Sequence, residues 1–321
     1  MTALINDTHI RTIGELSDES SHLANTGVTA DIVHRTHDRD VFVTSVRVVG
    51  PSHFEARAQL PARHSFYGPA GDRHDPLLVL ETVREAIFVV GHGSYGIPRD
   101  TSFIARGKEF EFYPAGLHAV GDVPVDLVID ITVTDIRRRG GAMTGARFTA
   151  ICFRDGEPVG TAAYDASFAS AAVYRRLRGD YKEAKPALAV DGPPVRPAAV
   201  GRTDELDVLL AAAPGGGWYL RVDPTHPVIF DHVIDHVPGN AAVEAGRQAA
   251  YLATDHPEAV LTSGAMSFRR YIEFDAPCLV VAAQTGETAD GRRTVAVGFT
   301  QNGDVSAEGT FELLLPRPAG A

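Results

Sequence analysis

Apolar residues recur along this chain with two periodicities, and the helical one covers two long stretches. In residues 75–90 an aspartate and a proline precede an almost continuous apolar run, which predicts a helix capped by Asp75 and ended by Gly91. In residues 238–253 small residues cover nearly every side of a second predicted helix. Helices that are apolar or small all round are usually buried, so a charged side chain within them needs a partner or a function.

Shorter β-rich runs surround each helix. Turn-forming residues at 50–52, 155–156 and 302–303 separate neighbouring runs and are typical of hairpins. One helix and several β-runs in each half form an α+β pattern. Two such half-sheets would most simply join edge to edge around both helices, because that covers edges otherwise exposed. The predicted strands are 41–49, 53–60, 101–116, 126–140, 146–156 and 160–170, then 207–213, 218–223, 266–275, 278–287, 293–301 and 307–315.

The first half of the chain is repeated in the second. Residues 75–86 align without a gap on residues 238–249, so that Glu81 falls on Glu244. In the same alignment Arg84 falls on Arg247, and Glu85 on Gln248. A repeat of this length indicates two homologous modules.

The repeat and the change of composition after residue 170 together predict the domain organisation. Residues 171–198 combine a potential short basic helix with a Pro/Ala-rich connector, so we place the linker there. The expected parts are a flexible arm at 1–28, a first module at 29–170, the linker at 171–198 and a second module at 199–316.

Several motifs occur in the order seen in one known family. They are HSFYGP and HDPLLVLETVREA in the first module, and RVDPTHP and FDHVIDHVPGNAAVEAGRQAA in the second. Together they resemble the A-factor biosynthesis hotdog family, which makes the skeleton of γ-butyrolactone signals. The resemblance implies an α+β tandem (double) hotdog, in which each module wraps an antiparallel sheet around a long central helix. The two modules would form a pseudo-dimer within one chain.

The activity that the resemblance implies is acyl transfer without a cofactor. An acyltransferase of this kind condenses a β-ketoacyl thioester, carried by an acyl carrier protein or by CoA, with dihydroxyacetone phosphate on the way to a butenolide or γ-butyrolactone. Residues 228–245 also resemble, more distantly, a segment of β-hydroxyacyl dehydratases, although the spacing from His232 to Glu244 is shorter than in those enzymes. Thioesterase or dehydratase chemistry therefore stays an alternative, as does a non-catalytic module that binds an acyl chain or a lactone.

Composition and net charge limit the kinds of partner and the cellular location expected of this chain. The 321 residues carry a net charge of −11, which argues against a nucleic-acid partner. The cysteines, Cys152 and Cys278, lie in apolar contexts without metal-ligand spacing, as expected of core residues in a reducing compartment. With no signal-like start and no apolar run long enough for a membrane, the expected location is the cytoplasm and the expected state a monomeric pseudo-dimer or a weak homodimer.

The strongest candidates for catalysis are two carboxylates and a histidine. Glu81 and Glu244 recur in the middle of the two helices, and the alternative to a catalytic role is a salt bridge to the arginine three residues on. Burial would raise their pKa and suit one of them for proton transfer. His232 precedes the second helix and has no certain counterpart in the first module. We therefore expect one productive site, built around His232 and Glu244.

Other residues are candidates for binding substrate. Backbone N–H groups at Gly239 and Asn240, where the second helix starts, could stabilise an oxyanion. Arginines in the helices and in the strand predicted at 266–275 could hold a phosphate. His232 and His236 are four residues apart but precede the helix, so no metal site is expected. The substrate-binding candidates are Gly239, Asn240, Arg84, Arg247, Gln248, Arg269, Arg270, His64, His226 and His236. Basic runs at Arg137–Arg139 and at Arg175, Arg176 and Arg178 could meet an acidic carrier.

Overall fold

A single antiparallel sheet of twelve strands runs through the whole computed structural model, which describes residues 27–68, 71–119, 121–183 and 187–316. Most of the expected N-terminal arm, residues 1–26, lies outside the described residues. The strand order is β1-β2-β4-β5-β6-β3-β9-β12-β11-β10-β8-β7. The strands are β1 (Val43–Gly50), β2 (His53–Leu60), β3 (Ser102–Phe112), β4 (Val125–Arg139), β5 (Ala142–Arg154), β6 (Glu157–Ala169), β7 (Leu210–Ala212), β8 (Trp218–Leu220), β9 (Val260–Phe268), β10 (Cys278–Glu287), β11 (Arg292–Gln301) and β12 (Asp304–Leu314).

The two halves of this sheet meet where β3 pairs with β9. These strands run antiparallel, with Lys108 opposite Met266 and Phe110 opposite Gly264. A Cβ at Gly264 would lie 2.5 Å from the ring of Phe110, so this position requires glycine for the close approach. The edge-to-edge joining predicted from the sequence is therefore confirmed.

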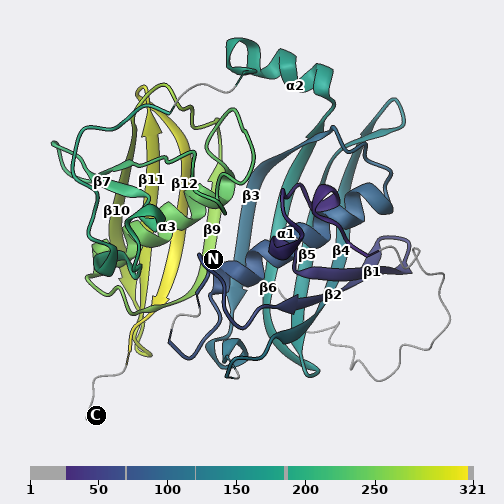
Figure 1. The fold of residues 1–321 in the computed structure, drawn as a ribbon, viewed down its shortest axis with the longest axis horizontal. Coiled ribbons are helices and arrows are strands. Elements are labelled where there is room, and N and C mark those ends of the chain that lie inside the picture. The colour runs from purple at the N-terminus through teal and green to yellow at the C-terminus, as the bar shows by residue number, and fades with distance from the viewer. Residues whose placement is uncertain (1–26, 69–70, 120, 184–186, 317–321) are drawn as a thin grey trace.

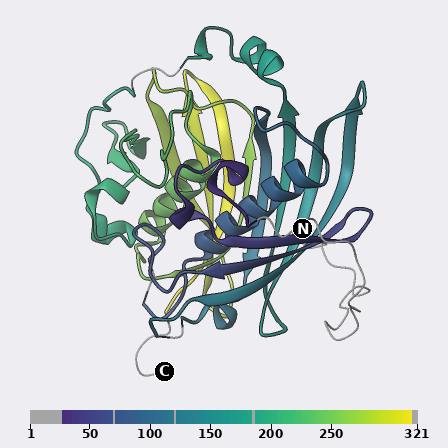
Figure 2. The ribbon, with the colours of Figure 1, turned by 45° about the vertical axis from the view of Figure 1, so that its right-hand side comes forward.

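Two long helices lie against the sheet, one in each half. Figures 1 and 2 both show α1 (Pro76–Gly93) in front of the first half and α3 (Gly239–Thr254) in front of the second. Asp75 caps α1 by accepting a hydrogen bond from the amide of Leu77 at 2.8 Å, as predicted. No helix of the described residues is long and apolar enough to cross a membrane.

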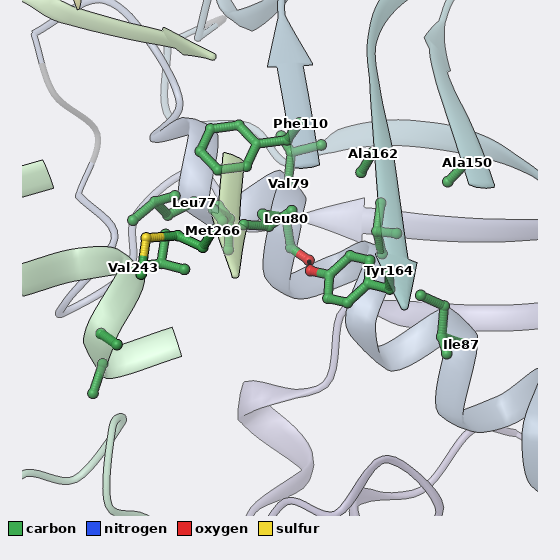
Figure 3. Close-up of a cluster of buried hydrophobic side chains, with 14 of the residues drawn as sticks. Leu77, Val79, Leu80, Ile87, Phe110, Ala150, Ala162, Tyr164, Val243 and Met266 are labelled. Carbon is green, nitrogen blue, oxygen red and sulfur yellow. Dashed lines mark hydrogen bonds between the residues drawn. The ribbon is translucent and has the colours of Figure 1, made fainter. Parts of the chain in front are cut away.

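The core is continuous across the boundary between the halves. Figure 3 shows Leu77 of α1, Val243 of α3 and Met266 of β9 gathered below Phe110 of β3. In the same cluster the hydroxyl of Tyr164 donates to the carbonyl of Leu80 at 2.7 Å, which ties β6 to α1. Since buried side chains of both halves share one core, the halves do not form separate hydrophobic units.

The strand predicted at 266–275 is wrong. β9 covers 260–268 instead. The chain then leaves the sheet because the residues after Phe268 make contacts with other parts of the fold. The carbonyl of Ile272 accepts a hydrogen bond from the amide of Val237, and Glu273 forms an ion pair with Arg178. These tertiary contacts outweigh the strand-like alternation of the segment.

The segment between the halves contains the expected short basic helix, α2 (Ala171–Arg178). The hairpin turns at 155–156 and 302–303 are also confirmed, with positive φ at Asp155, Gly156, Asn302 and Gly303. The exact division into arm, modules and linker stays a prediction.

The first copy contains a buried carboxylate where the second has an amide. The Oε2 atom of Glu85 accepts hydrogen bonds from the amides of Phe42 and Val43, but its Oε1 atom has no partner. Burial, together with the charge of Glu81, raises the pKa of Glu85 to about 7. Gln248 makes the equivalent contacts as a neutral group and satisfies its amide nitrogen as well.

The substitution Glu85→Gln should therefore stabilise the protein above neutral pH. A raised pKa means that the stability contributed by Glu85 is present below its ordinary value and is lost as pH rises through about 7. The amide removes that loss, and we expect a gain of roughly 1–2 kcal/mol at pH 8 and little at pH 5. Urea unfolding at both pH values measures it, and Gln248→Glu should show the opposite trend. An equal effect at both pH values would contradict this explanation.

Candidate active site

A cavity of about 270 Å³ lies where α1, β3 and the start of α3 meet. Both halves of the chain contribute to its lining, the second through residues 228–244. Apolar side chains such as Leu80 and Val243 form part of the wall. The polar side chains of its lining include Arg35, Arg84, Lys108, His232 and Asn240. This cavity is therefore shared between the halves and belongs to neither alone.

Glu81 lies buried behind this lining and holds three of its side chains. Its carboxylate is 2.5 Å from Nη2 of Arg35 and 2.6 Å from Nη2 of Arg84. It also accepts a hydrogen bond from the side-chain amide of Asn240, in α3, at 2.5 Å. Burial by itself would raise the pKa of Glu81, but the two guanidinium groups outweigh it and lower the pKa to about 2. The expected raised pKa is thus wrong for Glu81, which stays charged and positions its neighbours.

Glu244 has the equivalent place in the second copy. Arg202 and Arg247 pair with it at 2.8 and 2.5 Å, and Gln248 donates to it at 2.7 Å. Arg247 also binds Asp75 at 2.6 Å, so its guanidinium group is held between two carboxylates. Glu244 belongs to the cavity lining, whereas Arg247 and Gln248 do not. The structure therefore does not support Arg247 as a phosphate ligand or Gln248 as a substrate contact.

His232 stands at the cavity with a carboxylate beside it. Its Nδ1 atom lies 2.7 Å from Asp231, whose carboxylate can only accept, so Nδ1 is the donor and Nε2 is the ring nitrogen that this carboxylate does not use. Asp231 is held in turn by the amide of Thr36 at 3.0 Å and lies 3.7 Å from Arg35. Among the described residues no hydrogen bond joins His232 to Glu244. The network around His232 leads instead through Asp231 and Arg35 to Glu81.

Lys108 was not among the residues singled out from the sequence. It is buried on β3, and its ammonium group donates to the side-chain oxygen of Asn240 and lies 5.2 Å from the ring centre of Tyr164. Burial lowers the pKa of Lys108 to about 7. The alternation of side chains along a strand could have indicated it, because Lys108 lies on the same buried face of β3 as Phe110 and Phe112.

His34 is a second lining residue that sequence reasoning missed. Its Nε2 atom lies 3.0 Å from Nε2 of His92, on the side of α1. Burial and the charges of neighbouring groups lower the pKa of His34 to about 4, so it is neutral near pH 7. Positive charge in the cavity therefore comes from Arg35 and Arg84, and from Lys108 where it is protonated.

The start of α3 also faces the cavity, as expected. Pro238, Gly239 and Asn240 are part of the lining, and the first intrahelical hydrogen bond is donated by the amide of Ala242 to the carbonyl of Pro238. The amides of Gly239 and Asn240 precede this bond and belong to the helix end that has no intrahelical acceptor. They are available to a developing negative charge.

The remaining histidine candidates have different surroundings. His64 and His226 are buried, and the Nδ1 atom of each accepts hydrogen bonds from two amides of its own loop. Neither lines the cavity, so both shape loops and the substrate-binding role predicted for them is not supported. His236 lines the cavity and also a neighbouring one.

Arg269 and Arg270 lie beyond the end of β9, not within a strand. They pair with Glu308 and Asp304 and line only the neighbouring cavity. The strand expected to carry them ends at Phe268, so the structure does not support a role for either as a phosphate ligand in the cavity shared by the halves. Of the four candidate arginines only Arg84 reaches the cavity shared by the halves.

Comparison with known proteins agrees with this architecture. The A-factor biosynthesis hotdog domain matches residues 17–170 and again 184–315, which confirms the expected tandem hotdog. A 2-oxo-3-(phosphooxy)propyl 3-oxoalkanoate synthase of Streptomyces coelicolor is 38% identical over 277 residues, 85% of this chain and 87% of that protein. One of the same name from Streptomyces virginiae is 36% identical over 84% of this chain and 92% of that protein. A solved acyl-ACP thioesterase from Bacteroides thetaiotaomicron aligns over 81% of this chain and 97% of its own, with 12% identity and a TM-score of 0.49. The chain belongs to the A-factor biosynthesis hotdog family.

Proposed function

We propose that this chain transfers a 3-oxoacyl group from a thioester to the hydroxyl group of dihydroxyacetone phosphate. The curated relatives are named for the ester that such a transfer forms. The observation that carries the proposal is the cavity itself, where a carboxylate-oriented histidine, three cations and the start of α3 surround one space. An alcohol, a phosphate and a thioester carbonyl each find a suitable partner there.

The chemistry assigned to these groups is a single acyl transfer. Nε2 of His232 takes the proton of the acceptor hydroxyl, while Asp231 stabilises the imidazolium that forms. The hydroxyl oxygen attacks the thioester carbonyl, and the resulting oxyanion accepts hydrogen bonds from the amides of Gly239 and Asn240. The tetrahedral intermediate then expels the thiolate, which receives the proton from His232. The bond broken is carbon–sulfur and the bond formed is the carbon–oxygen bond of the ester.

The phosphate of the acceptor is assigned to Lys108 and Arg84. Both line the cavity, and Arg84 presents a planar guanidinium that suits phosphate oxygens. Glu81 and Asp231 balance the charges of Arg35 and Arg84, which leaves the ammonium group of Lys108 as the cation for the phosphate to neutralise. Lys108, whose pKa is near 7 in the empty cavity, is protonated when the phosphate enters.

Lys108→Met should consequently raise the KM for dihydroxyacetone phosphate by about 10–100-fold, the scale of a lost charge-assisted hydrogen bond of 1.5–3 kcal/mol. In the unmodified protein the same KM should rise above pH 7, by up to tenfold per pH unit, because binding then requires the uptake of a proton. Initial rates at several acceptor concentrations between pH 6 and 9 measure both effects. A pH-independent KM, or a variant that saturates normally, would place the phosphate elsewhere.

The activity itself is tested by product analysis. Purified protein, a 3-oxoacyl thioester and dihydroxyacetone phosphate should give a phosphorylated ester by mass spectrometry, with one acceptor consumed for each thiol released. Release of thiol without consumption of the acceptor would identify a thioesterase instead. Complete absence of turnover would favour a module that only binds acyl chains or a lactone.

A further inference from the structure

A short helix stands outside the sheet with its apolar side chains uncovered. Figures 1 and 2 show α2 projecting beyond the ends of the strands. Val173 and Leu177 on this helix are 46% and 59% exposed. Arg178 anchors it, with ion pairs to Asp235 at 2.9 Å and to Glu273 at 2.7 Å. The helix is thus fixed at one end while its apolar side chains face solvent.

A second cavity, of about 510 Å³, lies next to this anchor. Tyr174 of α2 lines it, as do β3 and residues 268–272. It shares Ile234, His236 and Gly239 with the catalytic cavity, so the two spaces adjoin at the start of α3. The second cavity is therefore the adjoining space from which a chain-like substrate could extend toward the groups assigned to catalysis.

The second cavity is strongly biased toward positive charge. Its lining contains Arg106, Lys182, Arg269 and Arg270 but only one acidic residue, Asp235. Asp235 is already engaged by Tyr174, Arg178 and His236. Arg269 and Arg270 are paired with Glu308 and Asp304, so Arg106 and Lys182 are the lining cations without an ion pair among the described residues, and they favour an anion here.

Further cationic and apolar side chains lie on the surface beside the cavity. Arg175 and Arg176 are exposed on α2. Val233, on the loop that lines the second cavity, is 87% exposed. A small phosphorylated ligand would be satisfied by the cations that line the cavity. Exposed apolar side chains beside further free cations fit the surface of an acidic protein better.

We propose that α2 and the rim of the second cavity dock an acidic acyl carrier protein, whose phosphopantetheine arm passes through this cavity to the catalytic one. This docking surface consists of Val173, Arg175, Arg176, Leu177, Lys182 and Val233. It rests on the proposed function, since it names the carrier of the acyl group that is transferred. The cations in the cavity hold the phosphate of the arm, and those on α2 meet carboxylates of the carrier.

The test reverses charge on α2 and compares three donors with the same 3-oxoacyl group. The variant is Arg175→Glu/Arg176→Glu, which keeps the anchor at Tyr174 and Arg178. With the carrier protein as donor, kcat/KM should fall at least tenfold at low salt. With the CoA thioester and the N-acetylcysteamine thioester it should stay within about twofold, because neither donor has a protein surface to dock. The matched control, Arg138→Glu/Arg139→Glu at the end of the β4–β5 hairpin, should affect none of the donors.

Three outcomes would overturn the docking proposal. An unchanged rate with the carrier would remove α2 from the interface, and a loss in the control would move the interface to the hairpin. An equal loss with carrier and CoA would show that the cations serve only the phosphate of the arm. If no donor yields the ester, the proposed function fails separately, and calorimetric titration with the carrier protein still decides the docking: binding that the α2 variant abolishes supports it, and no binding refutes it.

Discussion

Replacing His232 by alanine is expected to lower kcat by roughly 10²–10⁴-fold, the usual loss for a general acid–base group. The side chain is half exposed, and its hydrogen bonding within the described residues is limited to the neighbouring Asp231, so the fold should persist. KM for the acceptor should change little, because the phosphate is assigned to Lys108 and Arg84. Steady-state rates and a thermal unfolding curve of the same preparation separate loss of catalysis from loss of structure.

A matched control comes from another histidine–aspartate pair of this chain. Nε2 of His53 lies 2.7 Å from Asp130, the distance found between His232 and Asp231, but on the surface of β2 and β4. His53→Ala should leave kcat unchanged. If His232→Ala retained more than about a tenth of the activity, the base would have to be another group, and His34 would be the first to examine since it lines the same cavity.

The sequence was informative about the fold because its signals are local and repeated. Capping by Asp75, the turn residues of the hairpins and the alternation of the strands each act within a few residues. The repeat then predicted the joining of two half-sheets, which no single segment indicates. The prediction of a strand at 266–275 was wrong because that segment is determined by contacts with residues distant in sequence. Tyr271 and Glu273 both contact Arg178 of α2.

The candidate site was predicted less well, because it is made of contacts between the halves. Alignment of the copies pointed to Glu81 and Glu244 as equivalent residues, yet it could not show that Asn240 of one copy binds Glu81 of the other. The asymmetry arises where Asn240 falls on Leu77 in the alignment. An amide at the start of α3 opens a polar cavity against Glu81, whereas the start of α1 meets Glu244 through the ion pair of Asp75 and Arg247.

Glu81→Gln is expected to destabilise the protein by about 3–5 kcal/mol at pH 7, since it leaves two buried guanidinium groups without their shared carboxylate. The amide would also place donors against donors of Arg35 and Arg84. Chemical denaturation measures the loss. The same substitution at Glu109, also in the first half, removes a partly exposed ion pair with Arg147 and should cost at most about 1 kcal/mol.

The dependence on pH distinguishes a charged Glu81 from a merely well-packed one. Its folded pKa of about 2 lies below the ordinary value of 4.5, so its contribution is present above pH 4.5 and is lost as pH falls toward 2. One pH unit below 4.5, at pH 3.5, the difference in unfolding free energy between the unmodified protein and Glu81→Gln should have shrunk by about 1.4 kcal/mol, the equivalent of one pKa unit. A difference that stays constant between pH 7 and 3.5 would mean that folding leaves the pKa of Glu81 unchanged, and a difference that grows as pH falls from 7 would mean that Glu81 is protonated in the folded state. Proton transfer by this residue, expected from the sequence, would then return as the better explanation of its burial.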